Sequence, residues 1–509
     1  MTSISPLSRA TPAASSSTVY GASAAATTPA GAARAGESTV VSLGAAEAKP
    51  ASPSLVWENR VRSTASTMMA QNFTGQTAAG RLKGLGSELL KQVAYDGADF
   101  AQSVRQAPSG MYADTYDMLV SPSQVSQHGM GDNHFKLSIT TNSGVKVELA
   151  LDAGDDSIAI DARSSAKLND SEREALGKLA AAFQKAIDGL TEDPPRLDLA
   201  ELTQYDGAVL SSVDLKAQVK LGPKETQQLD FHADAAQRTL GFTGPAGSAR
   251  IAVDLSQPAA WGNKEQQAKA LNRYLQQVDQ AGLRGRGNGD MLGMFKQAFT
   301  EMNSDYGKRP VAQRDIALTD QDRAMTTGLA DFTASMSQTE VASNPMRVSE
   351  KDSFSYELSQ KTKIAGDSQL NRSIAQEQRS HLKARYHEPI KADASLALDL
   401  NPRSQNYRYV SIDDNASSST RIEYDQGVLA KAAQEMQASR SARVLTYTLG
   451  KLKEDHTTPS GKSVTRDFMN TLAPERDGGP ALAGAEREQA LAALNDKIFL
   501  QSDPDAIAK

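Results

Sequence analysis

The sequence predicts an α+β fold in which antiparallel sheets pack against amphipathic helices behind a disordered N-terminal tail. Several segments alternate apolar and polar residues between turn residues, which is typical of strands with one buried face. Other segments repeat apolar residues every three or four positions, which is typical of helices with one buried face. Residues 1–55 are dominated by Ala, Ser, Thr, Gly and Pro. Such a segment buries too little apolar surface to offset the entropy lost on ordering.

The first predicted elements after the tail are a helix, a set of hairpins and a second helix. Residues 79–106 predict a helix, because most of their large apolar residues fall at helical spacings. Period-two alternation then predicts antiparallel hairpins over residues 135–160. The next helix is predicted from 170 to 190, and Ser171 and Glu174 have the spacing of a capping box at its start.

The middle of the chain repeats this arrangement. Alternation predicts a second antiparallel set over residues 211–256, with a glycine-rich turn at 244–247. Helical spacing then predicts helices over residues 268–278 and 291–302, and a shorter helix near 319–336.

The last third of the chain is polar but keeps the alternation of strands, and it predicts an antiparallel β-meander. Residues 422–429 and 445–452 share the skeleton apolar-x-Tyr-x-x-Gly-x-Leu, in which glycine permits a tight turn between two strands. This skeleton resembles the hairpin of YD-type repeats in large bacterial surface and toxin shells. Two unrelated hairpins of a meander are the alternative, and residues 428–439 also have helical propensity.

Composition shifts divide the chain into four predicted parts. The parts are a disordered tail (1–55), an α+β domain (56–340), an antiparallel β-rich region (341–462) and a C-terminal helical tail (463–509). In the last part a helix is expected near 485–498, and the C-terminus is expected to fray after Asp503-Pro504.

Composition excludes several classes of protein. The 509 residues include no cysteine, which excludes disulfides, cysteine-ligated metals and thiol nucleophiles. The net charge of −6 and the lack of a basic stripe argue against nucleic-acid binding. No apolar run has the length of a membrane span. We expect a cytoplasmic protein, and the alternative is export by a route that uses no cleaved signal.

The glycine-rich stretch 284–290 is the most tempting candidate site. Its glycines stand beside Arg284 and Arg286 and could cradle an anion with backbone N–H groups. However, a helix precedes the stretch where a phosphate-binding loop would follow a strand, and no Lys-Ser/Thr pair is present. We therefore interpret the stretch as a linker between two helices.

No catalytic residue can be identified from the motifs, and no cofactor or metal is predicted. The acidic loop of Asp152, Asp155 and Asp156 lacks the spacing of a calcium loop, so its side chains are expected to be solvated. No histidine pair has the spacing of a metal-binding helix, and all six histidines are expected to be exposed polar residues. The six are His128, His134, His232, His381, His387 and His456.

One region carries a resemblance to a known family. The hairpin at 137–144 is followed by 168–176, and then by the short segments 197–199 and 213–215. This order resembles a family of proteobacterial proteins with no known activity. The resemblance covers residues 135–219 and implies a Gram-negative source, but it assigns a role to no residue.

These observations favour a non-enzymatic interaction or structural protein of a bacterium, with a protein as partner. Polar strands with aromatic cross-strand pairs can form such a binding surface. The first alternative is a hydrolase or toxin-like enzyme whose residues come together from distant segments. The second is a cytosolic scaffold that forms oligomers through its helices.

Overall fold

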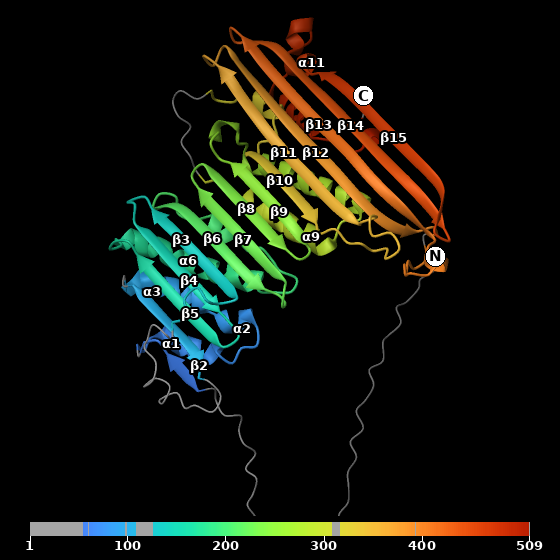
Figure 1. Ribbon diagram of the computed structural model, residues 1–509. Coiled ribbons are helices and arrows are strands. Elements are labelled where there is room, and N and C mark those ends of the chain that lie inside the picture. The colour runs from blue at the N-terminus through green and yellow to red at the C-terminus, as the bar shows by residue number, and fades with distance from the viewer. Residues whose placement is uncertain are drawn as a thin grey trace, which may run out of the picture. The chain divides into compact units, whose positions relative to one another are not determined.

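The computed structural model describes residues 54–59, 61–96, 99–107, 126–307, 316–391 and 393–507. These residues form one antiparallel sheet of fifteen strands, shown in Figure 1, in the order β1-β2-β5-β4-β3-β6-β7-β8-β9-β10-β11-β12-β13-β14-β15. From β6 onward every strand pairs with the next one in the sequence. The predicted antiparallel pairing is therefore confirmed, and the strands form a single sheet.

The first part of the sheet contains five strands and the helices that cover them. The strands are β1 (Leu55–Trp57), β2 (Phe100–Gln106), β3 (Asn133–Thr141), β4 (Lys146–Ala153) and β5 (Ser157–Ser164). The helices are α1 (Thr64–Asn72), α2 (Ala78–Leu82), α3 (Leu85–Asp96), α6 (Asp170–Leu190) and α7 (Ala200–Thr203).

The middle and the last parts continue the same sheet. The middle strands are β6 (Leu210–Lys220), β7 (Thr226–Asp234), β8 (Gln237–Gly244), β9 (Gly247–Asp254) and β10 (Asp331–Gln338). The last strands are β11 (Ser353–Gly366), β12 (Arg372–Pro389), β13 (Tyr407–Asp425), β14 (Val428–Thr448) and β15 (Lys451–Asp467). The helices are α8 (Lys264–Gly285), α9 (Gly289–Met302), α10 (Asp320–Ala324), α11 (Met469–Leu472) and α12 (Gly484–Lys497).

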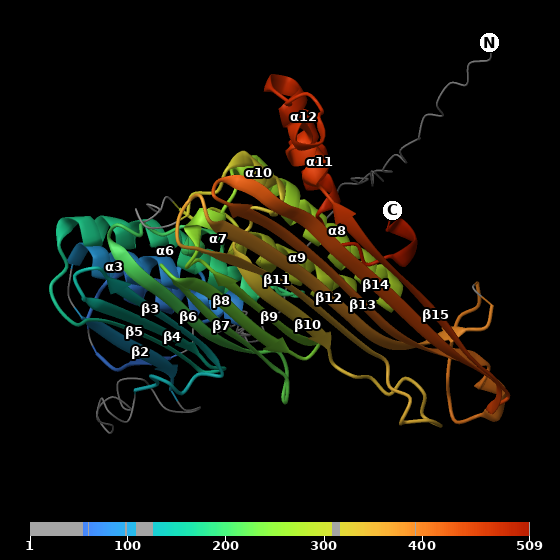
Figure 2. The ribbon, with the colours of Figure 1, turned by 90° about the horizontal axis from the view of Figure 1, so that it is seen from above.

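The two faces of the sheet differ. Figure 2 shows the helices gathered on one face, which we call the helix face, while the opposite, open face carries no helix of the described residues. On β11 the large side chains of Phe354, Tyr356 and Leu358 are buried on the helix face. Ser355 and Glu357 alternate with them and lie on the open face. Period two thus separates a core side from a polar side along the strands.

Aromatic packing joins the long helices to the centre of the sheet. Tyr274 of α8 meets Phe332 of β10 edge-on, with ring centroids 5.0 Å apart. Phe299 of α9 meets the same Phe332 ring at 4.9 Å. Edge-to-face contacts of this kind add to the hydrophobic stabilisation from burial. The buried hydroxyl of Tyr274 donates to Gln360 Oε1 at 2.9 Å, so its polar atom is satisfied.

Beyond α8 and α9, irregular segments cover the helix face, and buried glutamines hold them. Gln378 accepts from the backbone N–H of Leu500 and donates to the carbonyl of Ile498. Gln360 donates to the carbonyl of Leu329. Peptide groups of irregular chain need partners when they are buried, and the glutamines supply them. The predicted frayed C-terminus is wrong up to Ile507, which is fully buried.

The sheet ends at β15, whose side chains are exposed along nearly its whole length. An open edge of this kind is a template for pairing with another chain. Pro459 lacks a backbone donor, and Lys453 and Lys462 place charges along the strand. Proline and lysine are the devices by which natural sheets disfavour edge-to-edge association.

Two predicted helices are partly wrong. In the segment 79–106 the helices α2 and α3 end at Asp96, and Phe100 and Val104 lie in strand β2. In the segment 319–336 only α10 is helical, residues 325–330 are irregular, and β10 begins at Asp331. Apolar residues four positions apart in these segments suit one face of a helix. They also suit one face of a strand, because strand side chains return to the same face at every second residue. Pairing with neighbouring strands decides between the two periods.

Other predictions are confirmed or corrected in detail. The helix over 170–190 is present, but its capping box is formed by Asn169 and Glu172 in place of Ser171 and Glu174. The predicted boundary between residues 340 and 341 falls between β10 and β11, which are hydrogen-bonded neighbours. The predicted tail at 1–55 lies outside the described residues except for residues 54 and 55.

The two Tyr-x-x-Gly segments form matching hairpins. Gly427 lies in the turn between β13 and β14 with φ 81°, and Gly450 lies in the turn between β14 and β15 with φ 74°. The residues before them, Gln426 and Leu449, also have positive φ, which is the geometry of a two-residue turn that suits twisted strands. The stretch 428–439 is therefore strand, and its helical propensity is overridden by pairing with β13 and, from Ala433 on, also with β15.

A buried ion pair anchors α10 to the sheet, and its removal tests the packing. Arg372 of β12 donates to Asp322 at 2.9 Å, and both side chains are buried. We expect Arg372→Met to lower the free energy of unfolding by about 3–5 kcal/mol, because it leaves a buried carboxylate unpaired. Urea unfolding followed by circular dichroism measures the change.

The matched control removes both charges. The double variant Arg372→Met/Asp322→Asn should recover most of the loss, since no unpaired charge remains and the amide oxygen can still accept from Thr319 at the start of α10. Equal destabilisation of the single and double variants would contradict this assignment.

Candidate functional site

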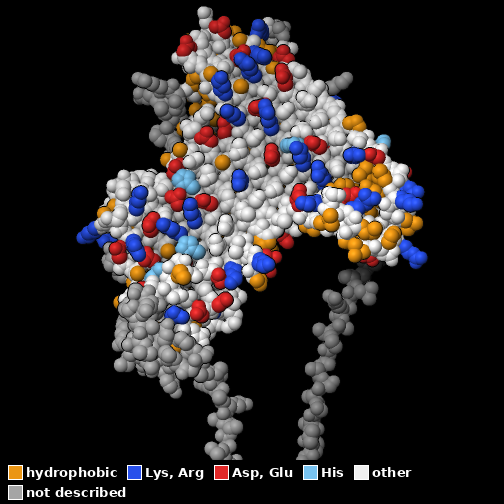
Figure 3. All heavy atoms as spheres, in the orientation of Figure 1, with side chains coloured by type: hydrophobic (Ala, Val, Ile, Leu, Met, Phe, Trp, Pro, Cys, Tyr) orange, Lys and Arg blue, Asp and Glu red, His pale blue; other side chains and the backbone are white. Residues whose placement is uncertain are grey.

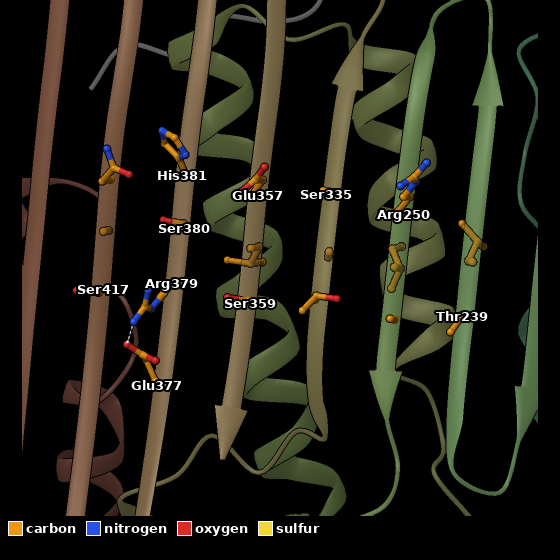
Figure 4. Close-up of a pocket in the computed structure, with 18 of the residues that line it drawn as sticks. Thr239, Arg250, Ser335, Glu357, Ser359, Glu377, Arg379, Ser380, His381 and Ser417 are labelled. Atoms are coloured by element: carbon orange, nitrogen blue, oxygen red, sulfur yellow. Dashed lines mark hydrogen bonds and ion pairs between the residues drawn. The ribbon is translucent and has the colours of Figure 1, made fainter. Parts of the chain in front are cut away.

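The open face of β8–β14 contains a row of aligned side chains. The strand register places Arg250, Ser335, Glu357, His381 and Asn415 opposite one another on β9 to β13. Each of these residues alternates with the buried residues of its strand, so its side chain lies on the open face. Figure 4 labels four of the five and shows them side by side. The row brings together residues that are far apart in the sequence.

Small side chains around this row leave the face hollow. Thr333, Ser359 and Ser417 lie in the next row together with Arg379, and Gly241 and Ala252 lie on β8 and β9. The result is a trough with a volume of about 1130 Å³. Figure 3 shows the centre of this face as mostly backbone and uncharged side chains, with charged groups around it. The floor of the trough thus offers hydroxyl and peptide groups.

Charged groups of both signs stand along the trough. Arg379 donates to Glu377 at 2.5 Å, and His381 contacts Asp413 at 2.9 Å. Arg250 and Glu357 lie in the same row and have no ion-pair partner in the part of the chain that the structure describes. A ligand that carries both a negative and a positive group can therefore form ion pairs with a guanidinium and a carboxylate in one site.

A second cluster of polar side chains lies at one end of the long strands. His387 of β12 is 1% exposed, and its Nδ1 lies 2.7 Å from Asp352 Oδ1. Its Nε2 lies 3.4 Å from Glu350 Oε2, and the Tyr407 hydroxyl donates to the same oxygen at 2.7 Å. The rings of Tyr407 and Tyr447 stack with centroids 4.8 Å apart. This is a small core on the open face, separate from the main one.

The cluster holds its histidine in the charged form. Burial opposes the protonation of His387, but hydrogen bonds to Asp352 and Glu350 outweigh it and raise the pKa of His387 to about 8. Burial would also raise the pKa of Glu350, and the hydrogen bonds from His387 and Tyr407 outweigh it and lower that pKa. Because both ring nitrogens of His387 face carboxylates of this chain, the cluster acts as a clamp for the loop 339–352.

The glycine-rich stretch 284–290 is confirmed as a helix–helix linker. α8 ends at Gly285 and α9 begins at Gly289. A Cβ on Gly285 would lie 2.8 Å from the Phe354 ring, so glycine allows close packing on the sheet. Arg284 binds Asp414, and Arg286 donates to Glu388 at 2.6 Å. Both arginines therefore serve ion pairs within the protein.

Two predictions about polar residues are wrong. All six histidines were expected to be exposed, but His387 is buried in the clamp and only His456 is exposed. The other four are half-buried against carboxylates: His128, His134, His232 and His381. Asp152 was expected to be solvated in a turn, but it lies on β4, is buried, and bonds His134 at 2.5 Å. Asp155 and Asp156 of the same loop are exposed as predicted. The alternation of the sequence places Tyr407 and Tyr409 on the open face of β13. Two large aromatic residues on this otherwise polar face are the one signal that could have indicated a second core there.

No group of three or more potential metal-ligating side chains is found among the residues that the structure describes. None of the described helices has the length and apolar character needed to cross a bilayer. The comparisons with known proteins give no relative: neither a family model, nor a curated protein, nor a solved structure matches the chain.

The charged clamp predicts a stability that falls with rising pH. The pKa of His387 is raised in the folded state, so its stabilisation is fully present below the unfolded pKa of about 6.5 and is lost as the pH rises through about 8. The difference corresponds to about 2 kcal/mol. The free energy of unfolding, measured by urea titration from pH 6 to pH 9, should decrease by at least this amount.

The variant His387→Gln separates the clamp from the other histidines. The pKa of His134 and that of His232 are also raised, through hydrogen bonds to aspartates, and both add a slope of the same sign. The variant should therefore show a clearly smaller decrease than the wild type. If both proteins lose stability equally over this range, His387 is not the group responsible.

Proposed function

We propose that this is a non-enzymatic interaction protein that binds a polar polypeptide on the open face of its sheet. The observation that carries this proposal is the trough on β8–β14, an uncovered area of a sheet whose other face is sealed by helices. The predicted location, cytoplasmic or exported without a cleaved signal, stays a prediction.

The chemistry of the trough supports a polypeptide partner. Hydroxyl groups of Thr333, Ser335 and Ser359 donate and accept hydrogen bonds, as do the peptide groups and polar side chains of a polypeptide. Arg250 and Glu357 are available for ion pairs with acidic and basic side chains of the partner. Polar and charged groups that complement those of the partner give an interface specificity and speed its formation.

The rigidity of the surface also supports the proposal. The floor residues belong to strands that pair on both sides and pack on α8 and α9, so the side chains are held before a partner arrives. Binding to a pre-organised surface loses less conformational entropy than binding to loops. The extent of the sheet provides room for the contact area of about 800 Å² per partner that stable interfaces need.

Filling the trough tests this function. Proteins bound to the tagged full chain are first identified in the native cell, and the affinity of each purified candidate is then measured by calorimetry. We expect the variant Ser335→Trp/Ser359→Trp to weaken the true partner about tenfold or more, because the rings occupy the floor of the trough.

The matched control is Ser138→Trp on β3. Ser138 also lies on the open face, but outside the trough. It should leave the affinity within about twofold of the wild type. If both tryptophan variants bind every partner as the wild type does, the trough is not the binding surface. Thermal melts of the two variants establish that they are folded.

A further inference from the structure

Exposed apolar side chains gather at one end of the long strands. Thirteen large apolar residues are exposed among those that the structure describes, and six of them belong to three neighbouring segments. We call these segments, residues 339–352, 393–406 and 448–453, the loop platform. Figure 3 shows them as an apolar area at the lower right of the open face, away from the trough. The six residues are Val341, Met346, Val348, Leu400, Leu449 and Leu452, which are between 44% and 74% exposed.

Hydrogen bonds fix the three segments to one another. Asn344 donates to Gln405 Oε1 at 2.8 Å, and the carbonyl of Gln405 accepts from the N–H of Gly450 at 3.0 Å. Arg347 donates to the carbonyl of Gly450 at 3.0 Å and lies over the Tyr447 ring. These hydrogen bonds hold the three segments in place, so the exposure of their apolar side chains is a property of the folded state.

The clamp described above lies directly beneath the platform. Glu350 and Asp352 belong to its first segment and bind His387 of β12. Leu396 and Leu398 of its second segment pack on the tyrosines of the same small core. The sequence thus uses a buried polar cluster and an apolar core to support loops whose outermost side chains remain in water, where they are unfavourable. Exposed apolar patches of this kind mark interaction sites.

The charges around the platform favour a negatively charged surface. Lys391, Arg403, Lys451 and Lys453 are exposed and have no ion-pair partner among the described residues. Several nearby acids are already engaged. Lys351 binds Glu340, and Glu350 and Asp352 serve the clamp. The exposed acids without a basic partner among the described residues are Asp393 and Asp399 in these segments and Glu454 just after the third segment, so the four bases outnumber them.

We propose that the loop platform docks onto the surface of a phospholipid bilayer. Aliphatic side chains on loop tips can insert between headgroups, and long basic side chains beside them can reach the phosphates. Each free base near an anionic surface adds to the attraction, with a strength that salt reduces. These side chains project from loops, from the turn before β15 and from the first residues of β15.

The test uses the purified full chain and vesicles of phosphatidylcholine with and without phosphatidylserine. We expect the wild type to sediment with both, and more strongly with the anionic vesicles at low salt. The variant Leu400→Asp/Leu449→Asp should bind at least about tenfold more weakly, because it places charges where apolar side chains insert. Both substituted residues are exposed, so the variant should keep its fold.

The matched control is Leu283→Asp on α8, a leucine outside the platform that is even more exposed. It should bind vesicles as the wild type does. No sedimentation of the wild type with either vesicle, or equal binding by the platform variant, would overturn the proposal. It would also be overturned if light scattering showed a dimer that only the platform variant dissociates, because the patch would then be an interface between two copies.

Discussion

The constraint on which this structure depends is that one face of a very wide sheet must be sealed while the other face stays in water. Strand alternation meets it by sending Phe354 and Tyr356 to the helices and Ser355 and Glu357 to solvent, and the same separation recurs on the neighbouring strands. A one-residue shift of register would exchange the two sides, so the buried face fixes the register of the row that lines the trough. The candidate site is thus a consequence of how the core is built.

Polar groups are buried in this protein where regular elements do not reach. Glutamines such as Gln360 and Gln378 satisfy the peptide groups of irregular segments on the helix face. On the open face His387 joins the loop 339–352 to β12 through two carboxylates. Each of these networks specifies one arrangement of chain, since a displaced segment would leave buried donors and acceptors unsatisfied. The networks position the surfaces for which we propose binding.

Much of the fold could be predicted from the sequence, because alternation and turn chemistry are local signals. The hairpins around Gly427 and Gly450 follow from residues a few positions apart. The strand at Phe100 and Val104 could not be predicted in this way, because a spacing of four suits both periods and distant pairing decides. The trough could not be predicted either, since its row joins strands whose relative register is set only in the folded sheet.

The separation of the two faces can be measured directly because the natural chain has no cysteine. Single cysteines are introduced at Ser335 and Ser359 on the open face, and at Ala334 and Leu358 on the helix face, and their reaction with a water-soluble maleimide is timed in the folded protein. The account predicts fast labelling at 335 and 359 and strong protection at 334 and 358. Equal rates at all four positions, or protection at 335 and 359, would contradict it.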